Sequence, residues 1–145
     1  MEELFEEAYP PVSENEIAEF ESEVGHRLPE EYRDLLGRSD GGDILDNDRA
    51  LVSIFGIAKD LPNWLSVRSH LEWYAGRIPD WLFPVGGDAY GNLFAISLRI
   101  SDSGTVWFWD HEEEAGEGED PTDGNLTCEG KTFNEFLAGL VPLCE

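Results

Sequence analysis

Three short apolar segments lie at hairpin spacing in the middle of the chain. They run from Trp81 to Val85, from Asn92 to Leu98 and from Thr105 to Asp110. Aromatic and β-branched residues dominate them, and the gaps carry the glycine and short polar residues that reverse a chain. The third segment is apolar on both faces. With an earlier strand predicted over Ala50 to Phe55, the pattern indicates an α+β fold. We expect an antiparallel sheet of about four or more strands, with helices packed on one side.

Two helices are expected before this sheet. Ser13 and Glu16 have the spacing of a capping box, and apolar residues follow at helical intervals as far as Val24, with Gly25 in position to end the helix. A second helix should start at Pro29, where the missing N–H costs nothing. It should stop at the Ser-Asp-Gly-Gly turn over residues 39–42.

Two further helices are predicted around and after the strands. Asn63 can cap a helix that runs to about Tyr74, with Trp64 among its buried residues. Thr132 can cap a last helix whose apolar side chains, from Phe133 to Leu140, complete the core. Between them, residues 112–129 are too polar to pack and are expected to form an acidic loop.

Length and composition fit one domain over residues 1–145, with an acidic leader over 1–12. The chain has 41% hydrophobic residues, with five Trp, eight Phe and four Tyr, which is enough apolar surface for a core. No apolar run approaches the roughly 20 residues that span a bilayer, and acids stand where a signal peptide carries bases. We therefore expect a cytoplasmic protein. Cys128 and Cys144 make neither a disulfide framework nor a metal cluster, and we interpret both as incidental thiols.

The net charge restricts the possible partners. The chain carries 32 Asp and Glu against 9 Lys and Arg, a formal charge of −23. Such a field repels nucleic acid and anionic membranes, and it attracts and orients a basic protein surface. The equal alternative is that the solvated acids only keep the protein in solution. The acids are concentrated in residues 2–31, in residues 40–48 and in residues 110–130.

Several segments resemble one family. The run Glu23-Val24-Gly25-His26-Arg27-Leu28-Pro29-Glu30-Glu31-Tyr32, followed by Leu35-Leu36 and Gly41-Gly42, resembles the opening of the SUKH superfamily in its Smi/Knr branch. Its strands and turn are similar to Trp81-Leu82-Phe83-Pro84-Val85-Gly86, Asp88, Gly91-Asn92, Phe94 and Val106-Trp107-Phe108-Trp109-Asp110-His111-Glu112. Its closing helix is similar to Phe133-Asn134-Glu135-Phe136-Leu137. The resemblance extends in the same order from Ser13 to Val141.

This resemblance implies an α+β domain that serves widely as a bacterial immunity protein. Such a protein binds and neutralises a polymorphic toxin, often a nuclease, and it has no catalytic residues, metal site or cofactor. Because many nuclease domains are basic, an acidic inhibitor could occupy the surface that nucleic acid would use. The expected partner is therefore a cognate protein toxin, a basic nuclease domain, with no direct contact to nucleic acid or membrane.

The acids on turns and loops are the candidate partner-binding residues, together with one aromatic anchor. The set comprises Asp40, Asp43, Asp46, Asp48, Asp88, Tyr90, Asp110, Glu112, Glu113 and Glu114. For Asp40 and Asp88, a capping or Asx-turn role is at least an equal alternative. For Trp107 and Trp109, packing in the core is favoured over contact with a partner.

Other functions remain open at this point. Asp110, His111 and the following glutamates could form a metal or enzymatic site, although adjacent residues on a strand point to opposite faces. The same superfamily includes cytoplasmic scaffold and regulatory proteins, which the sequence does not separate from immunity proteins. DNA mimicry uses the same electrostatics, but it needs acids spaced like phosphates. Acids crowded in a glycine-rich loop do not indicate that spacing.

Overall fold

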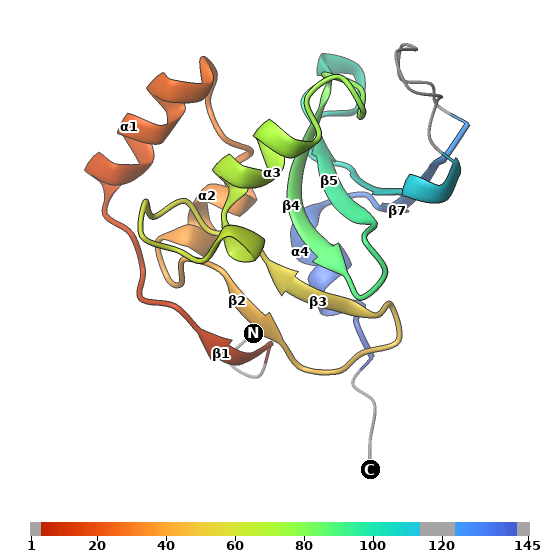
Figure 1. Cartoon of the computed structure of the whole chain (residues 1–145), viewed down its shortest axis with the longest axis horizontal. Coiled ribbons are helices and arrows are strands. Elements are labelled where there is room, and N and C mark those ends of the chain that lie inside the picture. Colours follow the sequence, from red (N-terminus) through yellow and green to blue (C-terminus); the bar gives the residue numbers. More distant parts are fainter. Residues whose placement is uncertain (1–3, 114–123, 142–145) are drawn as a thin grey trace.

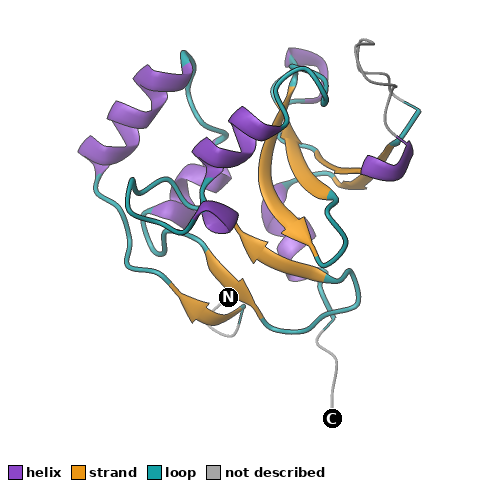
Figure 2. Ribbon diagram, in the orientation of Figure 1, coloured by secondary structure: helices purple, strands orange, loops and turns teal. Residues whose placement is uncertain are grey.

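The computed structural model describes residues 4–113 and 124–141. The strands form one sheet, and the helices and short 3₁₀ turns lie in the connections between the strands and at the end of the chain (Figures 1 and 2). In chain order the elements are β1 (Phe5–Ala8), α1 (Glu14–Val24), α2 (Glu30–Leu36), β2 (Gly42–Ile44), β3 (Leu51–Ile54), η1 (Asn63–Leu65), α3 (Val67–Trp73), β4 (Leu82–Asp88), β5 (Leu93–Ser97), η2 (Ile100–Asp102), β6 (Val106–Trp109), η3 (His111–Glu113), β7 (Leu126–Gly130) and α4 (Phe133–Ala138).

The sheet has seven strands, and their spatial order is the order of the chain, β1 to β7. Every neighbouring pair is antiparallel. Each connection therefore joins strands that are neighbours, and successive connections alternate between the two ends of the sheet. The connections β2–β3, β4–β5 and β6–β7 share one end, whereas the helical connections that contain α1, α2 and α3 lie at the other.

The predicted helix pair at the start of the chain is confirmed. Ser13 Oγ accepts from the N–H of Glu16 at 3.1 Å, and Glu16 Oε1 accepts from the N–H of Ser13 at 2.9 Å, which completes the capping box. Gly25 ends α1 in the left-handed conformation. Helix α2 begins one residue later than predicted, because Pro29 is its N-cap.

The predicted helix from Asn63 to Tyr74 is wrong in its first part. Residues Asn63–Leu65 form the separate 3₁₀ turn η1, and α3 starts only at Val67, with the side chain of Ser66 capping the N–H of Ser69. The side chain of Trp64, predicted to be buried, is 65% exposed. Ser66 adopts extended backbone angles, so it breaks the continuous helix that the apolar spacing suggested.

Three strands were missed in segments that are polar or rich in glycine. Residues 5–8 of the predicted acidic leader form β1, and residues 126–130, mostly within the predicted acidic loop, form β7. These are the two edge strands, which tolerate polar side chains because pairing uses the backbone. Gly42 begins β2 where a turn was predicted, and a Cβ there would lie 2.2 Å from the carbonyl oxygen of Glu7, so only glycine lets β1 approach.

Helices cover both faces of the sheet. Phe94 and Phe108 face each other on β5 and β6, and the Phe94 ring lies 5.1 Å from that of Phe136 in α4. Trp109 points to the opposite face and contacts Tyr74 at the end of α3, with ring centroids 5.4 Å apart. In Figure 1, α3 lies in front of the strands and α4 behind them. The α+β class and antiparallel sheet are confirmed, and because β5 and β6 are apolar on both faces, the helices are divided between the two faces.

The core joins the helix pair to the sheet. Tyr32 of α2 is fully buried against Phe83 of β4 and Phe133 of α4, with ring centroids 6.0 Å apart in both pairs. Its hydroxyl donates a 2.6 Å hydrogen bond to the carbonyl oxygen of Phe55. Burial of the phenol in this apolar surrounding raises the pKa of Tyr32 well above its usual value, which keeps the hydroxyl protonated as a donor.

Candidate functional site

The acidic connections of the chain meet at one end of the sheet. Leu51, which follows the β2–β3 connection, pairs with Asp88 at the end of β4, and Leu93 at the start of β5 pairs with Trp109 at the end of β6. The β2–β3 and β4–β5 connections, and η3 at the start of the β6–β7 connection, lie on the right of Figure 1. We call this surface the acidic end, defined by Asp46, Asp48, Asp88, Tyr90, Asp110 and Glu112.

The β4–β5 turn is built around the carboxylate of Asp88. Its Oδ1 accepts from the N–H groups of Tyr90 and Asn92 at 2.8 and 2.9 Å, and its Oδ2 accepts from Asn92 Nδ2 at 2.9 Å. The turn role that was the alternative interpretation of Asp88 is therefore present. The turn leaves the side chain of Tyr90 69% exposed at its tip.

His111 ties the end of β6 to this turn. The N–H of His111 donates to Asn92 Oδ1 at 2.9 Å, and its Nε2 donates to the carbonyl oxygen of Tyr90 at 2.8 Å. A Cβ at Gly91, whose φ is 90°, would lie 3.3 Å from the same Nε2. The sequence suggested His111 only as part of a metal or enzymatic site, since nothing in the local pattern shows a contact with a turn about twenty residues away. Within residues 4–113 and 124–141, no three His, Cys, Asp or Glu side chains are grouped so that they could hold a metal ion.

Asp110 and Glu112 follow directly after β6. The backbone N–H of Asp110 donates to the Asn125 carbonyl at 3.1 Å, and Asn125 Nδ2 donates to the Asp110 carbonyl at 2.9 Å. The Asp110 carboxylate accepts from the N–H of Glu112 at 3.0 Å, which turns the chain and leaves Glu112 exposed. Glu113 is the last residue of η3, and Glu114 lies outside the described residues.

The β2–β3 connection contributes two exposed carboxylates. Asp46 is exposed, and so is Asp48, whose Oδ1 accepts from the N–H of Val141 at 2.9 Å. The N–H of Asp48 in turn donates to the Val141 carbonyl at 2.9 Å. Asp48 therefore also holds Val141, the third residue after the end of α4. Arg49, the base in this connection, pairs with Glu129 of β7.

Two predicted residues do not belong to this surface. Asp40 is only 1% exposed, and its carboxylate accepts from the N–H groups of Ile57 and Ala58 at 2.7 and 3.0 Å. Burial raises the pKa of Asp40 above its usual value, and these two amides oppose the shift. The prediction of Asp40 as a contact residue is therefore wrong, because its side chain is a structural acceptor inside the fold. Asp43 is half-buried on β2, where Ser53 of β3 is its partner.

A groove borders the acidic end on the α3 face. We call it the Trp64 groove; its volume is about 200 Å³ and its lining includes Val52, Phe55, Trp64, His70, Tyr74 and Asp88. Trp64 and Val52 are the exposed apolar residues of this lining, at 65% and 45%. The sequence did not predict the groove, because Trp64 fitted the pattern of a buried position on a helix. Trp64 is exposed because the helix is interrupted at Ser66.

Three acids of helix α1 form ion pairs within the fold. Arg33 of α2 pairs with Glu14 at 3.0 Å and with Glu21 at 3.1 Å, both on α1. Arg68 of α3 pairs with Glu23 at 2.9 Å, and this hydrogen-bonded guanidinium lowers the pKa of Glu23. These bases therefore offset the acids of the helical side, away from the acidic end.

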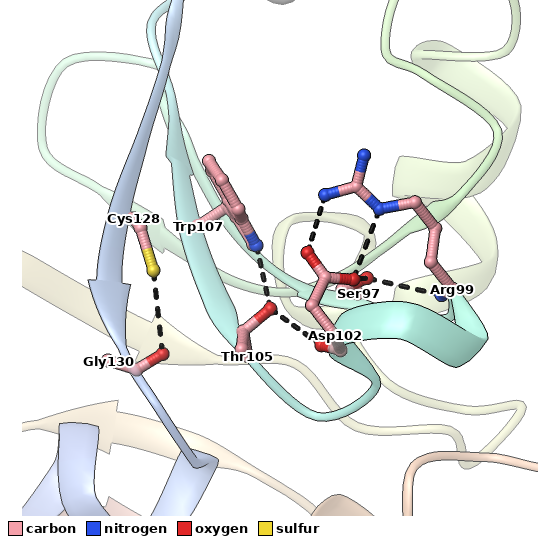
Figure 3. A network of polar contacts seen from close by, with 7 residues as sticks. All are labelled: Ser97, Arg99, Asp102, Thr105, Trp107, Cys128 and Gly130. Atoms are coloured by element: carbon pink, nitrogen blue, oxygen red, sulfur yellow. Dashed lines mark hydrogen bonds and ion pairs between the residues drawn. The ribbon is translucent and has the colours of Figure 1, made fainter.

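A polar network closes the β5–β6 connection at the opposite end of the sheet (Figure 3). Asp102 accepts from Ser97 Oγ at 2.6 Å and pairs with Arg99 at 2.5 Å, and the Arg99 contact holds the pKa of Asp102 below its usual value. The Trp107 indole donates to Thr105 Oγ1 at 2.8 Å. Trp109 is fully buried, whereas Trp107 is half-buried beside this network. Both tryptophans therefore have structural contacts, in line with the packing role favoured from the sequence. Figure 3 also shows Cys128, whose thiol points to the Gly130 carbonyl at 3.8 Å.

Comparison with known proteins places the chain in a family. The SPbeta prophage-derived uncharacterized protein YokK of Bacillus subtilis (strain 168) is 26% identical over 161 residues, which cover 92% of this chain and 77% of that protein. The sequence profile of the SMI1/KNR4 family (SUKH-1) matches residues 11–139, from the segment before α1 to the end of α4. No helix within the described residues is long and apolar enough to cross a membrane. The chain belongs to the SMI1/KNR4 (SUKH-1) family.

Proposed function

We propose that this protein is an immunity protein that binds and neutralises a cognate toxin with a basic nuclease domain. The observation that carries the proposal is the acidic end, where the β2–β3 and β6–β7 connections present exposed carboxylates and the β4–β5 turn presents the exposed Tyr90. A rim of acids around an aromatic side chain is the composition expected for recognition of a basic protein. The proposed action is binding alone, in the cytoplasm, without catalysis or a cofactor.

The position of the charge supports fast association. A net charge of −23 creates a long-range field, and the pairing of Arg33 and Arg68 with acids of α1 offsets part of the charge on the helical side. Fields of this kind can raise association rates toward the order of 10⁸ M⁻¹s⁻¹ at low salt. Speed matters for an inhibitor whose target is lethal when free.

A co-expression experiment tests the proposal. The product of the adjacent toxin gene is induced with and without this protein, and survival is scored. The double variant Asp46→Asn/Glu112→Gln removes two exposed charges from the acidic end. A matched control, Glu19→Gln/Asp34→Asn, removes two exposed charges from α1 and α2.

The proposal predicts an effect of position at equal net charge. The acidic-end variant should lose about two- to tenfold in association rate at low salt, and the loss should shrink as salt rises, whereas the control should change little. An acidic partner, binding that ignores salt, or equal losses in both variants would contradict the electrostatic role of the acidic end. If no toxin gene lies beside this gene, the alternative of a cytoplasmic scaffold or regulatory protein of the same superfamily is favoured.

A further inference from the structure

Aromatic side chains line the Trp64 groove. The imidazole of His70 stacks on Phe55 with ring centroids 3.8 Å apart and an interplanar angle of 16°. The Tyr74 ring lies nearly parallel to His70, at 6.2 Å and 4°. Trp64 adds an indole that is 65% exposed. Faces of aromatic rings carry partial negative charge and attract cations.

Two residues of the groove lining carry acceptor groups that suit a cation. His70 Nδ1 donates to the Ser66 carbonyl at 2.8 Å, so the neutral ring carries its proton on Nδ1 and Nε2 is left as an acceptor. Burial lowers the pKa of His70, which favours this neutral form. The second is Asp88, whose carboxylate is fixed by three hydrogen bonds. Among the described residues that line the groove, none is Lys or Arg.

We propose that the Trp64 groove is a binding site for an arginine side chain of the protein partner. The planar guanidinium stacks on the exposed indole of Trp64, and its N–H groups face Asp88 and the imidazole acceptor. Arginine fits better than lysine, because only a planar cation can stack on an indole and donate sideways at the same time. The identity of the partner rests on the proposed function; the preference for a guanidinium is a property of the groove itself.

A peptide titration tests this inference without any toxin. The probe is the blocked tripeptide acetyl-Gly-Arg-Gly-amide, added to ¹⁵N-labelled protein while the Trp indole N–H signals are followed by NMR. The matched control peptide carries citrulline, which has nearly the shape of arginine and no charge. The arginine peptide should shift the Trp64 indole signal saturably at millimolar concentrations, and the citrulline peptide should leave it nearly unchanged.

Three variants locate the effect. Trp64→Ala should abolish the saturable response of the backbone amides around the groove. Ile100→Ala is the control, because Ile100 is a fully exposed apolar residue of η2 at the opposite end of the sheet and does not line the groove; it should bind like the wild type. Val52→Lys places a positive charge at an exposed lining position and should weaken binding at least about tenfold.

The outcomes separate this inference from the proposed function. Equal binding of the citrulline peptide, or equal loss in the Trp64 and Ile100 variants, overturns the arginine site and leaves the toxin proposal standing. If the co-expression test fails while the arginine peptide still binds at Trp64, the site stands and the partner is a basic protein other than a toxin.

Discussion

The imidazole Nε2 of His111 donates a 2.8 Å hydrogen bond to the carbonyl oxygen of Tyr90. This contact fixes the tip of the β4–β5 turn against the end of β6. Replacing His111 with alanine should destabilise the protein by about 1 kcal/mol, the usual net contribution of such a hydrogen bond. Amide hydrogen exchange should accelerate most at Tyr90 and Asn92. Glu112→Ala, next to it and exposed, is the control; equal acceleration in both variants would show that His111 does not hold the turn.

Alanine substitutions at Gly91 and Gly104 separate the effect of a clash with His111 from the effect of backbone strain. Both have positive φ, 90° and 93°, so alanine at either position is strained by about 1 kcal/mol. Only at Gly91 would the new Cβ meet His111, since nothing lies within 4 Å at Gly104. Urea unfolding should therefore show a larger loss for Gly91→Ala than for Gly104→Ala. Equal losses would mean that the turn relaxes away from the imidazole freely.

Asp40 should make stability depend on pH in the direction opposite to a salt-bridged carboxylate. Its pKa is raised in the folded state, so the folded protein binds a proton more tightly at this site than the unfolded chain. The contribution is fully present below the unfolded pKa of 3.8 and is lost as pH rises through the folded pKa. Relative to Asp40→Asn, which does not titrate, the wild type should therefore lose stability as pH rises through this window.

The measurement is the difference in unfolding free energy between wild type and Asp40→Asn, taken at several pH values so that the titration of the other acids cancels. A difference that grows in favour of the wild type with rising pH would contradict the raised pKa. At any one pH the truncation Asp40→Ala should lower the free energy of unfolding by about 1–3 kcal/mol, because the buried N–H of Ile57 loses its acceptor.

His70 should contribute a second pH dependence with the opposite slope. Burial lowers its pKa below the usual 6.5, so the unfolded chain binds a proton more readily. The stabilisation is present above the unfolded pKa and is lost as pH falls through the folded pKa. The melting temperature should therefore drop between about pH 7.5 and pH 5.5, and by less in His70→Gln. An identical drop in both proteins would assign the effect to other groups. The arginine peptide should also bind more weakly at the lower pH.

The helices with strong end signals were predictable, and the polar strands were not. Ser13, Glu16 and Gly25 mark the limits of α1 through contacts among near neighbours, which a sequence displays directly. Edge strands β1 and β7 depend on backbone pairing with partners far along the chain, so their acidic side chains gave no strand signal. The candidate surface was partly predictable because connections in an antiparallel sheet carry exposed acids. Asp40 was placed on the surface because an aspartate beside a glycine pair looks the same in sequence whether its side chain is exposed or buried.

The sequence by itself determined the fold class, the alternation of helices and strands, and an excess of negative charge that suits a basic partner. These follow from local capping, from apolar periodicity and from the count of ionisable groups, none of which needs coordinates. Only the tertiary structure decided that the β2–β3, β4–β5 and β6–β7 connections share one end, and that Trp64 is exposed beside them. The reason is that strand order and register bring together residues that are distant in the chain, and these long-range pairings leave no local trace.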